Sequence, residues 1–369
     1  MKITDVTLTF FTWEGLPQIS YGLMIPALGG TSLLALLTIV TDDGVTGNSF
    51  LGSAVRSADI DGHLLIRILK PLLVGQDPLD RERIGQKLWA NVRATSVRVV
   101  GAVDVALWDL AGKAANMPIH QILGSYRHSI PAYASSPAYN SESEYCEEAL
   151  RCMSQGVQAY KIHARHPWTK DISICRSVRK AVGDEFCLMF DATWSYDYPT
   201  ALRVGRALEE LNFYWFEDPL SEWDIYNYVK LRQQLRIPLM ATELPSIGLE
   251  QYGPWIIAQA TDYLRGDVAF KGGITTVIKG AHLAEAFHMN YEIHHGGNSL
   301  NNVANLHAAM AIKNCEYFEV LLPDSANKFG LVEDLEIDSA GLVHAPMKAG
   351  LGVEIDFDLI KRNTQFVLQ

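Results

Sequence analysis

The chain has 369 residues, of which 48% are hydrophobic and 20% are charged, so it can bury a large core and is not a disordered tail. Its 31 lysines and arginines against 42 aspartates and glutamates give a net charge of −11, which disfavours a nucleic-acid partner because the surface repels phosphate backbones. The longest apolar run, Leu33 to Val40, is shorter than the roughly 20 residues that cross a bilayer, and no charged-then-apolar leader opens the chain, so we expect a soluble, cytoplasmic protein with no membrane partner.

The first part of the chain predicts a compact α+β unit. Residues 1–11 alternate polar and apolar side chains as a strand does, and residues 33–40 predict a second strand that turns at 42–44 into a third segment. Between them, residues 12–30 predict a long irregular loop, in which Trp13 and Glu14 are candidates for contact with a substrate. Apolar residues at helical spacing over 101–115, with Pro118 just beyond, predict a helix.

From Ile130 onward the sequence becomes rhythmic. Short β-branched or aromatic runs each end in a polar residue, and each is followed by a helical stretch. The run ends recur about every 26 residues, which is the length of one strand, one helix and two short loops. This repeat predicts a (β/α) barrel with seven or eight strands between residues 130 and 320. The run ends are Lys161 and His163, Asp191, Glu217, Glu243, Asp267, His294 and Glu319.

Three of these run ends are carboxylates that follow an apolar strand: Asp191, Glu217 and Glu243. A barrel gathers the carboxyl ends of its strands at one rim, where three acids repel one another unless a cation neutralises them. Oxygen ligands without cysteine or histidine favour magnesium over zinc, and they leave coordination positions for water and a substrate carboxylate. The alternative is that the acids are helix caps or loop salt bridges.

Two further pairs of run ends are candidates for proton transfer. Lys161 and His163 stand two apart on one strand, so both project to the same side, and a lysine beside a divalent cation is disfavoured in its protonated form. Asp267 and His294 end neighbouring strands, so we expect the aspartate to hold one ring nitrogen and the other to face the cavity. His295 is offset by one residue and is expected to point away.

Other segments remain open. Residues 49–58 are expected to reach over the barrel mouth, with His166 and Trp168 as further candidates there. The glycine pair after Lys271 reads as a tight turn, or as a phosphate site at a helix start. The five cysteines lie in apolar segments without CxxC spacing, and we expect reduced core thiols rather than a disulfide or a zinc site.

Four motifs accompany the run ends: the helix Ala102–Lys113, Trp215-Phe216-Glu217-Asp218-Pro219, Lys271-Gly272-Gly273-Ile274-Thr275 and Gly350-Leu351-Gly352-Val353-Glu354. With these motifs the chain resembles the mandelate racemase subgroup of the enolase superfamily, over nearly its whole length. The resemblance implies an α/β fold, with an N-terminal α+β capping domain over a modified (β/α)7β TIM-type barrel. It places the capping domain at residues 1–124, the barrel at 125–324, and the segment from about 325 to 369 back against the cap.

The resemblance also implies roles for the run ends. Asp191, Glu217 and Glu243 would hold Mg²⁺, Lys161 and His163 would supply a base, His294 and Asp267 would form a dyad, and Glu319 would bind the substrate carboxylate. The family commonly has Lys-x-Lys where this chain has Lys161-Ile162-His163, which leaves the choice of base open. Thr193 stands at a position where the family commonly has asparagine or histidine. A dehydratase that needs histidine at this position is therefore disfavoured. Thr193 is also a candidate substrate contact.

These features favour a lyase, a sugar-acid dehydratase that removes the proton α to the carboxylate and eliminates the 3-hydroxyl to give a 2-keto-3-deoxy acid. An isomerase, which would be a racemase or epimerase working by 1,1-proton transfer, needs bases on the same two faces and stays open. A catalytically inactive barrel used for binding is the third possibility. The expected partner is a small carboxylate substrate, and the resemblance implies assembly from several copies of the chain.

Overall fold

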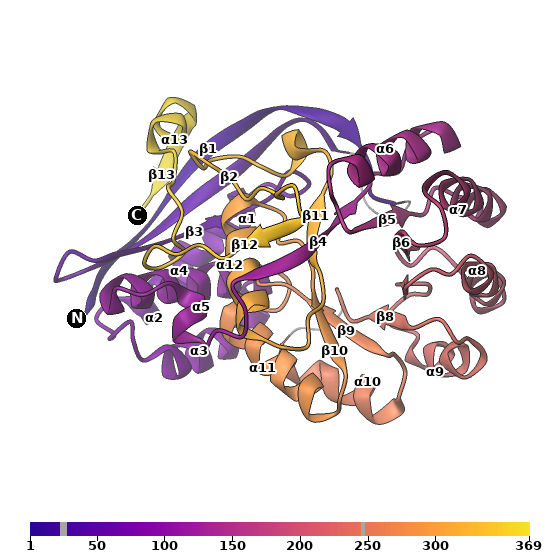
Figure 1. Cartoon of the computed structure of the whole chain (residues 1–369). Helices are drawn as coiled ribbons and strands as arrows, with labels where there is room; N and C mark the ends of the chain where they lie inside the picture. The colour runs from indigo at the N-terminus through magenta and orange to yellow at the C-terminus, as the bar shows by residue number, and fades with distance from the viewer. Residues whose placement is uncertain (23–27, 245–247) are drawn as a thin grey trace.

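The computed structural model describes residues 1–22, 28–244 and 248–369. In these ranges a four-stranded antiparallel sheet with its helices lies beside a closed parallel barrel ringed by helices (Figure 1). This arrangement confirms the predicted fold class. No helix in the described ranges combines the length and the apolar character that a membrane crossing requires.

The N-terminal sheet is built on one long hairpin. Strand β1 (Ile3–Ile19) pairs antiparallel with β2 (Leu28–Thr41), and β2 pairs with β3 (Thr46–Leu51) across the predicted turn. The prediction of an irregular loop over 12–30 was wrong for residues 12–19 and 28–30, because β1 and β2 pair through them with bulges that absorb the irregular spacing. Residues 23–27 of that predicted loop lie outside the described residues.

Helices complete the cap, and the longest of them is largely buried. Helix α4 (Val97–Ala115) begins four residues before the predicted helix and buries its length from Val99 to Gly112, since it contacts β3 on one side and α11 of the barrel on the other. The other cap elements are α1 (Asp59–Leu64), the π-helical turn η1 (Leu65–Leu69), α2 (Lys70–Leu73), α3 (Arg81–Ala90), the 3₁₀ turn η2 (Val92–Ala94) and α5 (Ile119–Ile122).

Within the described residues the barrel has eight parallel strands with a helix in each of the seven connections, and β11 pairs with β4 to close it. The strands are β4 (Ser129–Ser135), β5 (Ala159–His163), β6 (Cys187–Asp191), β7 (Phe216–Glu217), β8 (Leu239–Ala241), β9 (Tyr263–Gly266), β10 (Asn290–Ile293) and β11 (Phe318–Leu321). The helices are α6 (Glu142–Ser154), α7 (Trp168–Val182), α8 (Tyr198–Glu210), α9 (Ile225–Gln234), α10 (Tyr252–Ala258), α11 (Ile274–Ala286) and α12 (Ser299–Ala311), with 3₁₀ turns η3 (Leu249–Gln251) and η4 (Asp324–Ala326).

The chain returns to the cap after the barrel. Strand β12 (Leu342–His344) lies antiparallel beside β4, α13 (Phe357–Asn363) follows, and β13 (Thr364–Leu368) pairs with β1 at the edge of the N-terminal sheet (Figure 1). Two ends of the sequence therefore share one sheet. The predicted domain boundaries stay a prediction.

A buried carboxylate joins cap and barrel. Asp104 on α4 accepts hydrogen bonds from the Thr275 backbone nitrogen at 2.9 Å and from the Thr275 hydroxyl at 2.6 Å, at the first turn of α11. At Gly273, whose φ is 107°, a Cβ atom would lie 2.3 Å from the Asp104 side chain. The side chain of Asp104 thus occupies the helix start at which a phosphate site was considered, and the glycine pair serves as a tight turn against α4.

Candidate active site

The barrel brings the predicted acids together at the carboxyl ends of its strands. In the strand register His163 lies opposite Asp191, and Asp191 lies opposite Glu217. One ligand oxygen from each of Asp191, Glu217 and Glu243 lies within 4.8 Å of the others. Three carboxylates from three neighbouring strands therefore face one point.

The third acid lies beyond the end of its strand and is positioned by a neighbouring loop. Glu243 follows β8 by two residues, and the buried carboxylate of Glu222 accepts hydrogen bonds from the backbone nitrogens of Glu243 at 2.5 Å and Leu244 at 3.0 Å. On the other side, Thr242 Oγ1 donates to the carbonyl of Arg265 at 3.1 Å. The segment that carries Glu243 is thus fixed from both neighbouring strands.

Lys161 lies beneath this cluster as a buried cation. Its Nζ lies 2.8 Å from Glu217 Oε2, 2.8 Å from Glu319 Oε1 and 3.5 Å from Asp191 Oδ2, and its side chain is only 1% exposed. Burial and the charge of Arg265 oppose protonation, but Glu217 and Glu319 outweigh them and raise the pKa of Lys161 well above its usual range.

Arg265 is a second buried cation that the sequence reasoning missed. Its Nε lies 2.7 Å from Glu217 Oε1, and its Nη2 donates to Tyr133 Oη at 3.1 Å and to Glu319 Oε2. Burial would lower its pKa, but Glu217 and Glu319 raise the pKa well above the usual range. The sequence did contain a signal for it, which is the lone arginine inside the apolar strand Tyr263–Gly266. A charged side chain is rarely buried in such a strand without acidic partners.

The carboxylates in this cluster outnumber its lysine and arginine side chains. Six charged side chains meet in it: Asp191, Glu217, Glu243, Glu319, Lys161 and Arg265. Four carboxylates thus face two cations. Burial, together with the neighbouring acids, raises the pKa of Glu217 and raises that of Glu243 to about 7. Donors that are all oxygen, converging within reach of one ion, fit Mg²⁺, whose two charges would complete the balance.

His163 is oriented by a backbone carbonyl. Its Nδ1 lies 2.6 Å from the Ser136 carbonyl oxygen, which only accepts, so Nδ1 carries the proton of the neutral ring. Its Nε2 lies 3.2 Å from Asp191 Oδ2. The nitrogen able to take a proton is therefore the one directed at the acid cluster.

His294 is oriented by Asp267, as the strand-end spacing predicted. His294 Nδ1 lies 2.7 Å from Asp267 Oδ2, and Asp267 Oδ1 accepts from the backbone nitrogens of Ala269 at 2.7 Å and Phe270 at 2.9 Å. The other ring nitrogen, Nε2, lies 3.3 Å from Glu243 Oε1. Burial opposes a charged imidazole, but Glu243 and Asp267 outweigh it and raise the pKa of His294.

A cavity of about 390 Å³ opens above these groups. Its barrel wall includes His163, Asp191, Thr193, Glu243, His294 and Glu319, and its other wall comes from the cap, with Phe50 to Arg56 and Arg98. The segment 49–58 therefore covers the barrel mouth as expected. His295 also lines the cavity, contrary to expectation, because β10 ends at Ile293 and strand alternation no longer holds beyond it.

Four candidate substrate contacts lie outside this cavity. Trp13 is buried in β1 with its ring stacked on Phe329 at a centroid distance of 5.1 Å, and Glu14 is exposed on the same strand. Continuation of β1 through this region gives both side chains strand positions rather than loop positions. His166 and Trp168, after β5, are also absent from the lining. Thr193 lines the cavity, and its backbone nitrogen donates to Asp191 Oδ1 at 2.8 Å.

Glu319 lies at the same end of the barrel, on β11. Its Oε2 accepts from the His295 backbone nitrogen at 3.0 Å and from Arg265. Burial would raise its pKa, but Arg265 and Lys161 hold it well below the usual range. In this arrangement Glu319 accepts hydrogen bonds and anchors the two cations.

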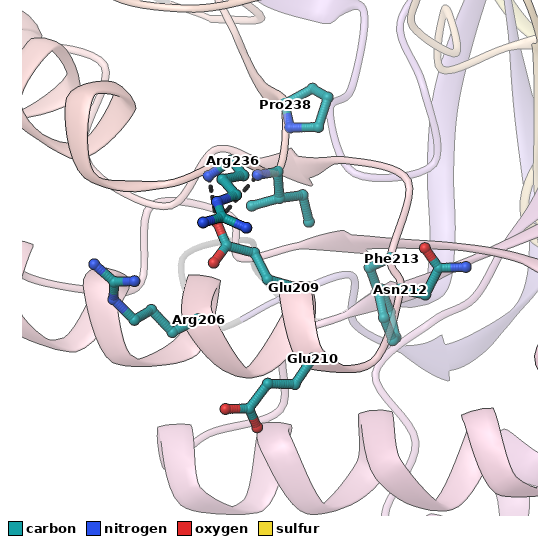
Figure 2. Close-up of a pocket in the computed structure, with 8 residues that line it drawn as sticks. Arg206, Glu209, Glu210, Asn212, Phe213, Arg236 and Pro238 are labelled. Atoms are coloured by element: carbon teal, nitrogen blue, oxygen red, sulfur yellow. Dashed lines mark hydrogen bonds between the residues drawn. The ribbon is translucent and has the colours of Figure 1, made fainter.

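A second cavity, of about 490 Å³, lies near the amino ends of β7 and β8, at the opposite end of the barrel (Figure 2). Figure 2 shows Glu209 directed at the segment around Arg236, where its carboxylate accepts from the backbone nitrogens of Arg236 and Ile237. The acid is thus part of a loop connection. None of the predicted site residues lines this second cavity.

Family models match two parts of the chain. Residues 26–124 match the N-terminal domain of mandelate racemase/muconate lactonizing enzyme, and residues 144–359 match an enolase C-terminal domain-like model. A solved structure of D-glucarate dehydratase from Agrobacterium tumefaciens, complexed with magnesium, is 32% identical and superposes with a TM-score of 0.88 over 99% of this chain and 100% of that one.

Characterised relatives carry out more than one reaction. An L-talarate/galactarate dehydratase from Salmonella typhimurium is 31% identical over 60% of each chain, so this chain matches less than two thirds of that relative. An arabinonate dehydratase from Saccharolobus solfataricus is 28% identical over 96% of each chain. An N-succinyl-L-Arg/Lys racemase from Bacillus cereus is 26% identical over 89% of this chain and 86% of that enzyme.

Proposed function

The chain belongs to the mandelate racemase/muconate lactonizing enzyme family of the enolase superfamily, and from that premise we propose that it is a magnesium-dependent dehydratase of a sugar acid, an aldonate or aldarate. Asp191, Glu217 and Glu243 hold the ion in this proposal. Bound there, Mg²⁺ supplies Lewis-acid stabilisation of the negative charge that develops on the substrate carboxylate as the α-proton leaves.

One observation carries the proposal: two oriented imidazoles flank the acid cluster from different strands. His163 Nε2 lies beside Asp191 and His294 Nε2 lies beside Glu243, at 3.2 and 3.3 Å. A carboxylate substrate at the acids then has one base on each side of its α-carbon. Proton transfer on both faces is what an elimination with separate base and acid requires.

The chain's own groups perform the proton steps. His163 takes the α-proton through Nε2, because the Ser136 carbonyl keeps the proton on Nδ1. His294, held by Asp267, gives a proton to the departing 3-hydroxyl, which leaves as water. Lys161 stays cationic between Glu217 and Glu319, where its charge favours anion formation at the substrate carboxylate. The enol product rearranges to a 2-keto-3-deoxy acid.

The second candidate is a racemase or epimerase. The same two imidazoles would run a 1,1-proton transfer if His294 returned a proton to the α-carbon instead of the 3-hydroxyl. The observation that supports this second candidate is the similarity to the racemase from Bacillus cereus. The two reactions differ only in where the second proton goes.

The deciding experiment incubates the protein and Mg²⁺ with a panel of sugar acids in deuterated water, while proton NMR follows the α-position and a colorimetric assay follows keto acid. We expect keto acid to form from at least one sugar acid. Deuterium at the α-carbon without keto acid would contradict dehydration and support the isomerase. If no acid in the panel gives keto acid or α-deuterium, the result contradicts both the dehydratase and the isomerase.

A further inference from the structure

The cavity over the acid cluster has a cationic end that the proposed chemistry leaves unused. Arg98 lines the cavity wall formed by the cap, as the second residue of α4, and Arg56 lines the same wall. The proton-transfer groups all come from barrel strands at the other wall. A sugar acid bound by its carboxylate at the acids would share the cavity with these guanidinium groups.

Arg98 has no acidic partner of its own. Among residues 1–22, 28–244 and 248–369 it makes no hydrogen bond or ion pair, and residues 23–27 and 245–247 include no acidic side chain. The first turn of α4 likewise contains no acid. Burial and the nearby charge of Arg56 lower the pKa of Arg98. An anion bound in the cavity would therefore stabilise the charged form of this half-buried guanidinium.

The two acids whose charges act on Arg98, Asp267 and Asp61, are already satisfied. Asp267 accepts from two backbone nitrogens and faces His294, and Asp61 accepts from Arg56 Nε at 3.1 Å and Nη2 at 3.3 Å. Arg56 is consequently occupied on the side that would bind a carboxylate in a bidentate manner. Of these two cavity-lining arginines, Arg98 is therefore the one without an acidic partner in the described part of the chain.

An aromatic ring fixes where Arg98 points. Its Cζ lies 4.5 Å from the centroid of the Phe270 ring, and that ring lies 5.7 Å from the His294 ring. The guanidinium thus stacks on a side chain that itself contacts the proton-transfer histidine. This contact holds Arg98 at the cavity that His294 also lines.

We propose that Arg98 binds a second, terminal carboxylate of the substrate, so that the sugar acid is a dicarboxylic one, an aldarate. The inference rests on the proposed function, because the first carboxylate is assigned to the acid cluster and its ion. A carboxylate matches the single charge and the planar donors of one guanidinium. A terminal phosphate would bring up to two charges against one unpaired cation and matches less well.

The test compares a panel of hexaric acids with hexonic acids of matching configuration, with Mg²⁺ present, by keto-acid kinetics and by calorimetric Kd. For the wild type we expect kcat/KM for the best diacid to exceed that for its monoacid at least about tenfold. Arg98→Met should lower this ratio by about 10- to 100-fold. Arg98→Lys keeps the charge and loses the planar arrangement of donors, so its ratio should lie between those of the wild type and Arg98→Met. The control Arg93→Met, at an exposed arginine in η2 outside the cavity lining, should keep the ratio.

The outcomes separate this inference from the function on which it rests. A wild-type ratio near one, an equal loss on both substrates in Arg98→Met, or a preference for hexonic acids with a terminal phosphate would overturn the second-carboxylate site and leave dehydration standing. Tight diacid binding without keto acid or α-deuterium exchange would overturn dehydration and support the site. The wild-type ratio decides even if a variant fails to fold.

Discussion

Arg265 Nε lies 2.7 Å from Glu217 Oε1 inside the barrel, and both side chains are completely buried. The pair lies below the cavity, whose lining includes neither residue. It therefore links the acid cluster to the barrel core. The strength of this link is open to measurement.

Replacing Arg265 with methionine should destabilise the protein strongly. The change leaves the carboxylates of Glu217 and Glu319 buried without their guanidinium, and breaking a buried ion pair from one side costs about 3–5 kcal/mol. Urea unfolding measures the loss. The control Arg232→Met breaks a half-exposed pair with Asp262 at 2.8 Å and should cost about 0–1 kcal/mol. Equal losses in the two variants would contradict the account of Arg265.

Replacing either imidazole should separate the two proton transfers. In His294→Asn we expect α-deuterium exchange to persist while keto-acid formation falls by about 10²–10⁴, because His163 still takes the proton and the departing hydroxyl has no acid. In His163→Asn both signals should fall together. Proton NMR and a keto-acid assay measure them. Exchange that survives in His163→Asn but not in His294→Asn would reverse the assigned roles.

Asp267→Asn should slow the reaction without removing a contact. The asparagine oxygen remains with the backbone nitrogens of Ala269 and Phe270, so its NH₂ group faces His294 Nδ1 and disfavours the imidazolium that would donate a proton from Nε2. We expect kcat to fall by about 10²–10⁴ with little change in KM. A variant with wild-type kcat would show that the orientation of His294 does not matter.

The sequence predicts this dyad for a physical reason, and it predicts the acids for the same reason. Parallel strands of one barrel end at one rim, so a regular spacing of run ends places Asp191, Glu217 and Glu243 together before any coordinates are known. The spacing of strand ends does not predict Arg265, because this side chain enters the cluster from inside β9. Burial of a charge within a strand depends on partners from other strands.

The cap was less predictable than the barrel. Glycine and proline near the ends of residues 12–30 suggested a loop, but pairing with β2 keeps residues 12–19 in the strand and carries Trp13 into contact with Phe329. Tertiary pairing of this kind overrides local preference.

Away from the site, His307 should make stability depend on pH. Its Nε2 faces the Leu351 carbonyl at 2.9 Å and its Nδ1 accepts from the His120 backbone nitrogen at 3.2 Å, which fits a neutral ring. Burial lowers its pKa from 6.5 to about 3. Below pH 6.5 the imidazole binds a proton in the unfolded chain but not in the folded protein. The contribution of His307 to the free energy of unfolding is therefore complete above pH 6.5. It is lost as the pH falls, by about 1.4 kcal/mol per pH unit.

Urea unfolding between pH 7 and 5 measures this dependence. The variant His307→Gln should be less stable at pH 7 but should lose less stability per pH unit than the wild type, because one proton-linked group is gone. The exposed His282→Gln should keep the wild-type slope. Identical slopes for all three proteins would show that His307 titrates alike in the folded and unfolded states.

The most direct test of the account removes the metal and follows the α-proton. In deuterated water with a sugar-acid substrate, we predict α-deuterium exchange and keto acid with Mg²⁺, loss of both after chelation, and recovery when Mg²⁺ is added back. Glu217→Gln should show neither signal and should lack the thermal stabilisation by Mg²⁺, about 2.7 kcal/mol at 100 times Kd, that the exposed control Glu185→Gln retains. Exchange that continues unchanged in metal-free protein, or in Glu217→Gln, would contradict the claim that these acids act by holding a divalent cation.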